Sequence, residues 1–143
     1  MKLYFLRHGT AADVAPSDAE RALTKEGREE ARIAGAALAA LKARPARVAS
    51  SPLLRARETA ELAAAALGFK GDLTVLPELL NDTELGALLR SVKTLGPADE
   101  VLLVGHMPSL AEHVAALIGD KRAAIEFGKG SVACVELETL RAG

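Results

Sequence analysis

The chain has 143 residues, of which 50% are hydrophobic and 26% charged, and its formal net charge is −1. This composition is typical of one folded domain, and the near-neutral charge gives no reason to expect nucleic acid or an anionic membrane as a partner. The single cysteine, Cys134, excludes an intramolecular disulfide framework and a cysteine-rich zinc site. No apolar run approaches the roughly 20 residues of a membrane span, so we expect a cytoplasmic protein.

The first half of the chain predicts two strands, each followed by a helix. A short apolar strand over residues 2–6 leads into a loop, and Thr24 is placed to cap the helix that comes after it. A second brief strand, over 47–50, ends at a pair of serines. Because Ser51 precedes a proline, and proline favours the first helical position, Ser51 is expected to cap the next helix.

The second half continues this alternation of strands and helices. It predicts a strand over 73–76, a helix capped by Asp82 or Thr83, a continuous apolar strand over 101–104, a further helix, and a last strand over 131–137. Such alternation is typical of an α/β fold with three layers, in which helices cover both faces of a mostly parallel sheet. We expect a single domain over residues 1–143, and the strand order stays open.

The residues directly after the strands carry the chemistry. In parallel sheets ligands bind beyond the carboxyl ends of the strands, and His8 and His106 each follow an apolar strand. Arg7 adjoins His8, and Arg55 lies near the start of the helix that follows 47–50. Guanidinium groups match phosphate oxygens, and imidazole can act as a nucleophile near neutral pH. This set predicts a phosphoryl-transfer site that needs no metal and no cofactor. The third histidine, His113, is expected to face solvent or to cap its helix.

Four segments, in this order, resemble the histidine phosphatase superfamily, which has the phosphoglycerate mutase-like fold. They are 6–9 (LRHG), 23–27 (LTKEG), 51–60 (SPLLRARETA) and 104–108 (VGHMP). Within the superfamily, the short length and the segment 75–79 (VLPEL) look most like the phosphohistidine phosphatases of the SixA type. The resemblance implies the same fold without a large cap insertion.

The resemblance also implies roles for individual residues. His8 matches the family nucleophile, which takes the phosphoryl group and forms a phosphohistidine intermediate. Its imidazole must be neutral to attack, and a backbone carbonyl near Gly9 is a candidate to hold the required tautomer. Arg7, Arg55 and His106 match the phosphate pocket, where they would neutralise charge in the transition state. Arg21 is a further candidate for substrate binding.

The general acid departs from the family pattern. Phosphomonoesterases of the superfamily place a Glu or Asp over the leaving group, and Glu78 is the nearest equivalent here, with Asp82 next. The glycine and aromatic residues that usually follow this acid are missing. A phosphoramidate such as phosphohistidine needs such an acid less than a phosphate ester does, because its ring can leave as neutral imidazole. The departure favours cleavage of P–N bonds.

The substrate and the partners follow as expectations. Little chain is left for a lid between Arg55 and His106, and an open groove suits a phosphorylated protein, such as a phosphotransfer or phosphocarrier domain. The alternative is a small-molecule phosphomonoesterase on the same scaffold. A mutase is disfavoured, and a non-catalytic phosphate-binding module is disfavoured because it would need no nucleophile. No apolar stripe demands a partner subunit, so we expect a monomer.

Overall fold

The computed structural model describes residues 1–120 and 122–138. Within them, five strands form one sheet in the order β3-β2-β4-β1-β5. Their bounds are β1 (Lys2–Arg7), β2 (Arg47–Ser50), β3 (Leu73–Val75), β4 (Glu100–Gly105) and β5 (Val132–Glu136). The pairs of β2 with β3 and β4, and of β1 with β4, are parallel, whereas β5 runs antiparallel to β1. The expectation of a mostly parallel sheet is confirmed.

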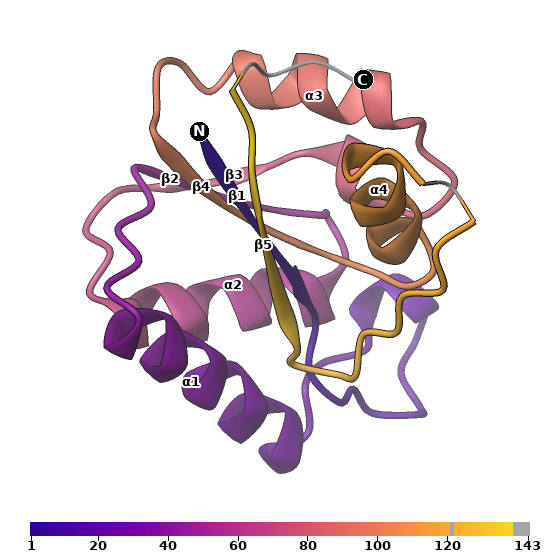
Figure 1. Ribbon diagram of the computed structural model, residues 1–143. Coiled ribbons are helices and arrows are strands. Elements are labelled where there is room, and N and C mark those ends of the chain that lie inside the picture. Colours follow the sequence, from indigo (N-terminus) through magenta and orange to yellow (C-terminus); the bar gives the residue numbers. More distant parts are fainter. Residues whose placement is uncertain (121, 139–143) are drawn as a thin grey trace.

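Helices cover both faces of this sheet. They are α1 (Lys25–Ala40), α2 (Leu54–Leu67), α3 (Leu85–Lys93) and α4 (Ser109–Leu117), with two short 3-10 helices, η1 (Asp18–Glu20) and η2 (Pro77–Leu79). Figure 1 shows α1 and α2 on one side of the sheet and α3 and α4 on the other. This is the three-layer architecture expected from the alternation of the elements. No helix in the described ranges is both long enough and apolar enough to span a membrane.

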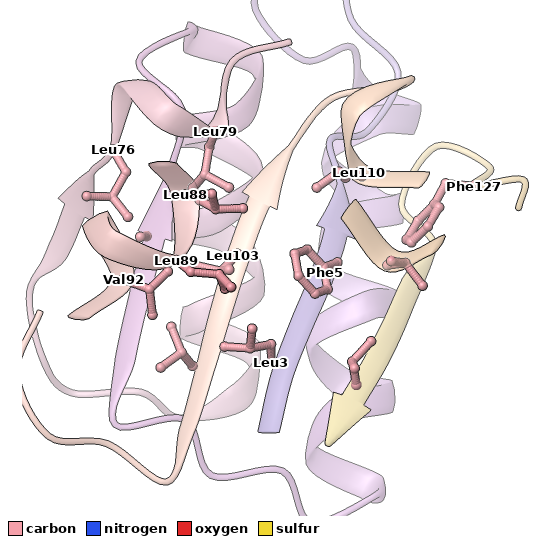
Figure 2. Close-up of a cluster of buried hydrophobic side chains, with 14 residues drawn as sticks. Leu3, Phe5, Leu76, Leu79, Leu88, Leu89, Val92, Leu103, Leu110 and Phe127 are labelled. Atoms are coloured by element: carbon pink, nitrogen blue, oxygen red, sulfur yellow. The ribbon is translucent and has the colours of Figure 1, made fainter. Parts of the chain in front are cut away.

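Each face of the sheet has its own hydrophobic core. Successive strand residues point to opposite faces, so Leu3 and Phe5 of β1 pack under α3 and α4. Figure 2 shows this cluster, with leucines of α3 and Leu110 of α4 above the strands. Tyr4 and Leu6 face the other side, where alanines of α2 make up much of the core. The small alanine side chains allow α1 and α2 to lie close to each other and to the sheet.

The helix starts differ in part from the expectations. Thr24 caps α1 as expected, because its hydroxyl accepts a hydrogen bond of 3.0 Å from the N–H of Gly27. The expectation that Ser51 caps α2 is wrong: the helix begins at Leu54, and the Ser51 hydroxyl lies 2.6 Å from His106 Nε2 instead. The cap expected at Asp82 or Thr83 is also wrong, because the residue before α3 is Glu84, without a side-chain cap.

Candidate active site

Three neighbouring strands deliver their next residues to one edge of the sheet. In the order β2-β4-β1, these residues are Ser51, His106 and His8. The N–H of Ser51 donates to the carbonyl of Val104 over 3.1 Å, and the N–H of His8 donates to the carbonyl of Gly105 over 3.2 Å. His106 therefore lies between the other two, and its ring centroid is 5.0 Å from that of His8. The strand order brings the two predicted histidines together.

The His8 ring is held as a neutral nucleophile would be. Its Nδ1 lies 2.7 Å from the carbonyl oxygen of Gly9. Nδ1–H donates to that oxygen in the neutral ring, which leaves the lone pair on Nε2. Burial, with smaller effects of the Arg55 and Arg7 charges, lowers the pKa of His8 to about 4, although the Gly9 hydrogen bond opposes the shift. His8 is thus uncharged at neutral pH, and the carbonyl contact is the one expected near Gly9.

His106 is more deeply buried than His8. Its side chain is 3% exposed, and burial, followed by the proximity of His8 and Arg55, lowers its pKa to about 3. One ring nitrogen, Nε2, contacts the Ser51 hydroxyl. The other, Nδ1, is buried and has no hydrogen-bond partner among the described residues. A buried polar atom without a partner in a cluster of cationic groups is well suited to contact an anionic ligand.

The two predicted arginines, Arg7 and Arg55, are anchored by different parts of the chain. Arg7 Nη1 donates to the carbonyl of Phe127 over 2.7 Å, and the Arg7 backbone pairs with Gly130 and Ser131 in the loop before β5. Arg55 is only 9% exposed, and its Nη1 donates to the backbone carbonyl of Asp18 over 2.9 Å. Both guanidinium groups keep N–H donors that these contacts do not use, so they can bind phosphoryl oxygens.

Arg21 joins the site through an acidic residue that the sequence analysis did not select. Asp18 Oδ1 lies 3.1 Å from Arg21 Nη1, and Asp18 Oδ2 lies 3.2 Å from Arg55 Nη2. These hydrogen bonds, from Arg21 first and then from Arg55, lower the pKa of the Asp18 carboxyl. Arg21 Nε also donates to the carbonyl of Ala12 over 2.6 Å. The structure therefore ties Arg21 to the edge of the site through Asp18.

The two candidate general acids lie nearby without joining the cluster. Within the described part of the chain, no hydrogen bond or ion pair links Glu78 or Asp82 to the histidines or arginines of the site. The backbone N–H of Asp82 donates to Ser109 Oγ over 2.8 Å, which ties its loop to the start of α4. The element that carries Glu78, η2, does border the site, because the carbonyl of Leu79 lies against Gly105.

Three residues of the site were not predicted from the sequence. Asp18 carries a detectable signal, since it stands three residues before Arg21, a spacing at which opposite charges can meet in one turn. Ser51 is the second such residue. It follows a strand at the same edge as the histidines, but the proline after it points to a helix cap. The third is Lys129, which lies in the turn before β5 and lowers the pKa of His8 by its charge. Nothing in its local sequence distinguishes it from any other surface lysine.

Metal ligands are not gathered at this site. Across residues 1–120 and 122–138, no group of three or more histidine, cysteine, aspartate or glutamate side chains is placed to hold a metal ion.

Comparisons with known proteins agree with this geometry. The sequence pattern of the histidine phosphatase superfamily (branch 1) matches residues 3–88. Phosphohistidine phosphatase SixA of Escherichia coli is 37% identical over 120 residues, which cover 82% of this chain and 74% of that protein. An uncharacterised protein of Picosynechococcus is 40% identical over 122 residues, covering 82% and 73% of the two chains. A solved structure of the protein histidine phosphatase SixA with tungstate superposes with a TM-score of 0.87 at 33% identity, covering 96% of this chain and 88% of that one.

Proposed function

This chain belongs to the histidine phosphatase superfamily (branch 1), and we propose that it hydrolyses phosphohistidine on proteins through a phosphorylated His8. The phosphatase class follows from the family, and the relatives named for phosphohistidine support the finer assignment. The observation that carries the proposal is the state of His8. Its neutral ring is fixed by the Gly9 carbonyl and lies close enough to the guanidinium groups of Arg55 and Arg7 for their charges to lower its pKa.

The geometry accounts for two chemical steps. In the first, Nε2 of His8 attacks phosphorus, the P–N bond of the substrate breaks, and the departing imidazole takes a proton from solvent and leaves neutral. In the second, water attacks phosphorus, the bond to His8 breaks, and inorganic phosphate and the neutral ring are regenerated. Arg7, Arg55 and His106 would stabilise the charge on the phosphoryl oxygens in both transition states.

The preference for a P–N bond rests on the polarity of the site. The charges that lower the pKa of His8 are those of the cations Arg55, Arg7 and Lys129. Asp18, the carboxylate that contacts the cluster, has a lowered pKa and is therefore ionised at neutral pH, so it cannot donate a proton there. An ester substrate needs a proton on its leaving oxygen, whereas a protonated imidazole leaves without help from the protein.

A small-molecule phosphomonoesterase is the second candidate. It is favoured by one contact, the approach of the Leu79 carbonyl to Gly105, which sets η2 and therefore Glu78 beside the end of β4. From this position a modest movement of the Glu78 side chain could bring an acid over a leaving group. Because the side chain is partly exposed, it is free to make such a movement.

A rate comparison separates the two candidates. Hydrolysis of a histidine-phosphorylated protein and of a sugar phosphate, whose alkoxide leaving group needs a proton, would be measured at neutral pH with the wild type, His8→Ala and Glu78→Gln. We expect faster P–N hydrolysis that His8→Ala reduces to background, and no more than about twofold loss with Glu78→Gln, since a true general acid contributes about 10²–10⁴-fold. Faster ester hydrolysis with a large loss in Glu78→Gln would establish the second candidate. Binding of phosphate without turnover of either substrate would leave a phosphate-binding module.

A further inference from the structure

The placement of the Ser51 hydroxyl follows from the strand order. Ser51 is the first residue after β2, and His106 is the first after its neighbour β4. Both are buried, with exposed fractions of 0% and 3%. The 2.6 Å between Ser51 Oγ and His106 Nε2 is a short hydrogen bond between two groups that water does not reach. One of the two atoms must donate, and the choice decides where the proton of the His106 ring resides.

The available protons and lone pairs favour one direction of this bond. Ser51 Oγ already accepts from the N–H of Leu53 over 3.3 Å, and its own proton needs an acceptor. If Nε2 carried the ring proton, the buried hydroxyl proton would have no acceptor among the described residues, and Nδ1 would be a buried acceptor without a donor. If the hydroxyl donates to Nε2, the hydroxyl proton and the Nε2 lone pair are both satisfied, and the ring proton lies on Nδ1, where it is a free donor for an anionic ligand.

We propose that Ser51 is a positioning residue that holds His106 as the Nδ1–H tautomer, so that its free N–H donates to an oxygen of the phosphoryl group on His8. This role deepens the proposed function and rests on it. The two rings lie 5.0 Å apart, centroid to centroid, so a phosphoryl group on His8 brings acceptor oxygens to the neighbouring ring. The lowered pKa of His106 agrees with a neutral donor, and no protonation of this ring is then needed for catalysis.

The tautomer can be observed directly, without any substrate. The chain has three histidines, so a long-range ¹H–¹⁵N correlation spectrum of the labelled protein contains only three ring systems. His113→Gln and His8→Gln variants would assign them. We expect a protonated Nδ1 and an unprotonated Nε2 for His106, unchanged between about pH 6 and 8. A wild-type ring that carries its proton on Nε2, or on both nitrogens, overturns the proposal, whatever the activity of the protein proves to be.

Variants of the two neighbouring serines test whether Ser51 determines the tautomer of His106. Ser51→Ala should move the His106 proton at least partly to Nε2 and lower kcat by about 10–100-fold, since loss of one donor to a developing charge costs up to about 10²–10³. Ser51→Thr, which keeps the hydroxyl, should restore both the Nδ1–H tautomer and kcat. Ser50→Ala is the matched control, because Ser50 is equally buried but its hydroxyl bonds the Ser51 carbonyl instead. An unchanged His106 tautomer in Ser51→Ala would show that Ser51 does not hold the ring in this form.

The outcomes keep this inference apart from the proposed function. A protein that hydrolyses neither substrate but shows the Nδ1–H tautomer would refute the phosphatase step on phosphohistidine and leave the role of Ser51 in orienting the ring intact. A protein that is active and shows the Nε2–H tautomer would support the phosphatase step and refute the role of Ser51. Should Ser51→Ala fail to fold, the wild-type spectrum alone still decides where the proton lies.

Discussion

Of the residues that the sequence did not indicate, Asp18 changes the description of the site most. It uses both carboxylate oxygens and its backbone carbonyl to contact two guanidinium groups, those of Arg21 and Arg55. The contacts to Arg55 use one N–H on each of its terminal nitrogens, so its remaining N–H groups stay available for a phosphoryl group. Charge alone would make an acidic residue unfavourable beside an anionic substrate. We therefore infer that Asp18 serves to orient the two arginines.

Substitution of Asp18 tests this inference against a simple effect of charge. We expect Asp18→Asn to lower kcat/KM by about tenfold, because an amide has one acceptor oxygen and its NH2 group would face one of the two guanidinium groups. Glu20→Gln is the matched control, since it removes the same charge from the same 3-10 helix, where the Glu20 carboxylate accepts a hydrogen bond from Ser17 and, among the described residues, bonds no guanidinium group. Steady-state kinetics and the binding of phosphate would be measured for both. Tighter phosphate binding by Asp18→Asn than by the control would show that Asp18 acts only as a competing anion.

At the scale of elements, the site depends on how closely the loop after β1 approaches the first turn of α1. A Cβ added to Gly9 would lie 2.5 Å from the carbonyl of Gly27, and one added to Gly27 would overlap the carbonyl of Thr10. The N–H of Thr24 donates to the same Thr10 carbonyl over 2.9 Å. Two glycines thus allow backbone to pack on backbone, and this contact holds the residue that follows His8.

Replacing Gly27 by alanine should separate packing from helix propensity. In an ordinary helix this change stabilises the protein by about 0.5–1 kcal/mol. Here we expect it to reduce the free energy of unfolding by about 2 kcal/mol, since the added methyl group has no space. Gly86→Ala is the control, because the nearest atom to its Cβ is the flexible end of Arg90, so it should be neutral or stabilising. Urea denaturation would compare them, and equal effects of the two variants would contradict the packing argument.

At the scale of the whole molecule, the three histidines are all kept neutral by burial. Burial lowers the pKa of His8 to about 4 and that of His106 to about 3, and it also lowers the pKa of His113. The expectation that His113 faces solvent is wrong, because its side chain is 3% exposed. The helix that carries it turns this position toward the sheet. The folded protein therefore resists taking up three protons that the unfolded chain accepts near pH 6.5.

This difference makes stability depend on pH in a defined direction. Above about pH 6.5 the histidines are neutral in both the folded and the unfolded state, so they do not make the free energy of unfolding depend on pH. Below it the unfolded chain binds protons that the folded chain does not, so the free energy of unfolding falls as pH falls, by about 1 kcal/mol per pH unit for each such histidine. The window extends down to about pH 4, where His8 itself begins to be protonated.

Urea denaturation between about pH 5 and 7.5 would measure this slope, in a range where the carboxylates change little. His113→Gln should make the slope shallower, because the variant lacks one of the rings whose pKa is lowered by burial. A stability that stays flat between pH 5 and 6.5 would contradict the neutral burial of these rings.

Several parts of the site were within reach of the sequence because each is a local pattern. The apolar runs before His8 and His106 identify two strand ends, and the parallel geometry of α/β folds places such ends at one edge. The alternation of strands and helices likewise predicted the three layers, and short-range capping by Thr24 was predicted correctly. These features depend on side-chain periodicity and on neighbours within a few residues, which a single sequence records directly.

The remaining features depend on contacts between segments that are distant in the sequence. The order β3-β2-β4-β1-β5 decided that the Ser51 hydroxyl meets His106 instead of capping a helix, because β2 and β4 are neighbours. It also decided that the loop before β5 lies against Arg7. A hydroxyl or a carboxylate can satisfy several partners, and only the packed chain selects one. The sequence by itself determined the layered fold and the histidines and arginines at the strand ends, whereas the tertiary structure decided which buried groups orient them.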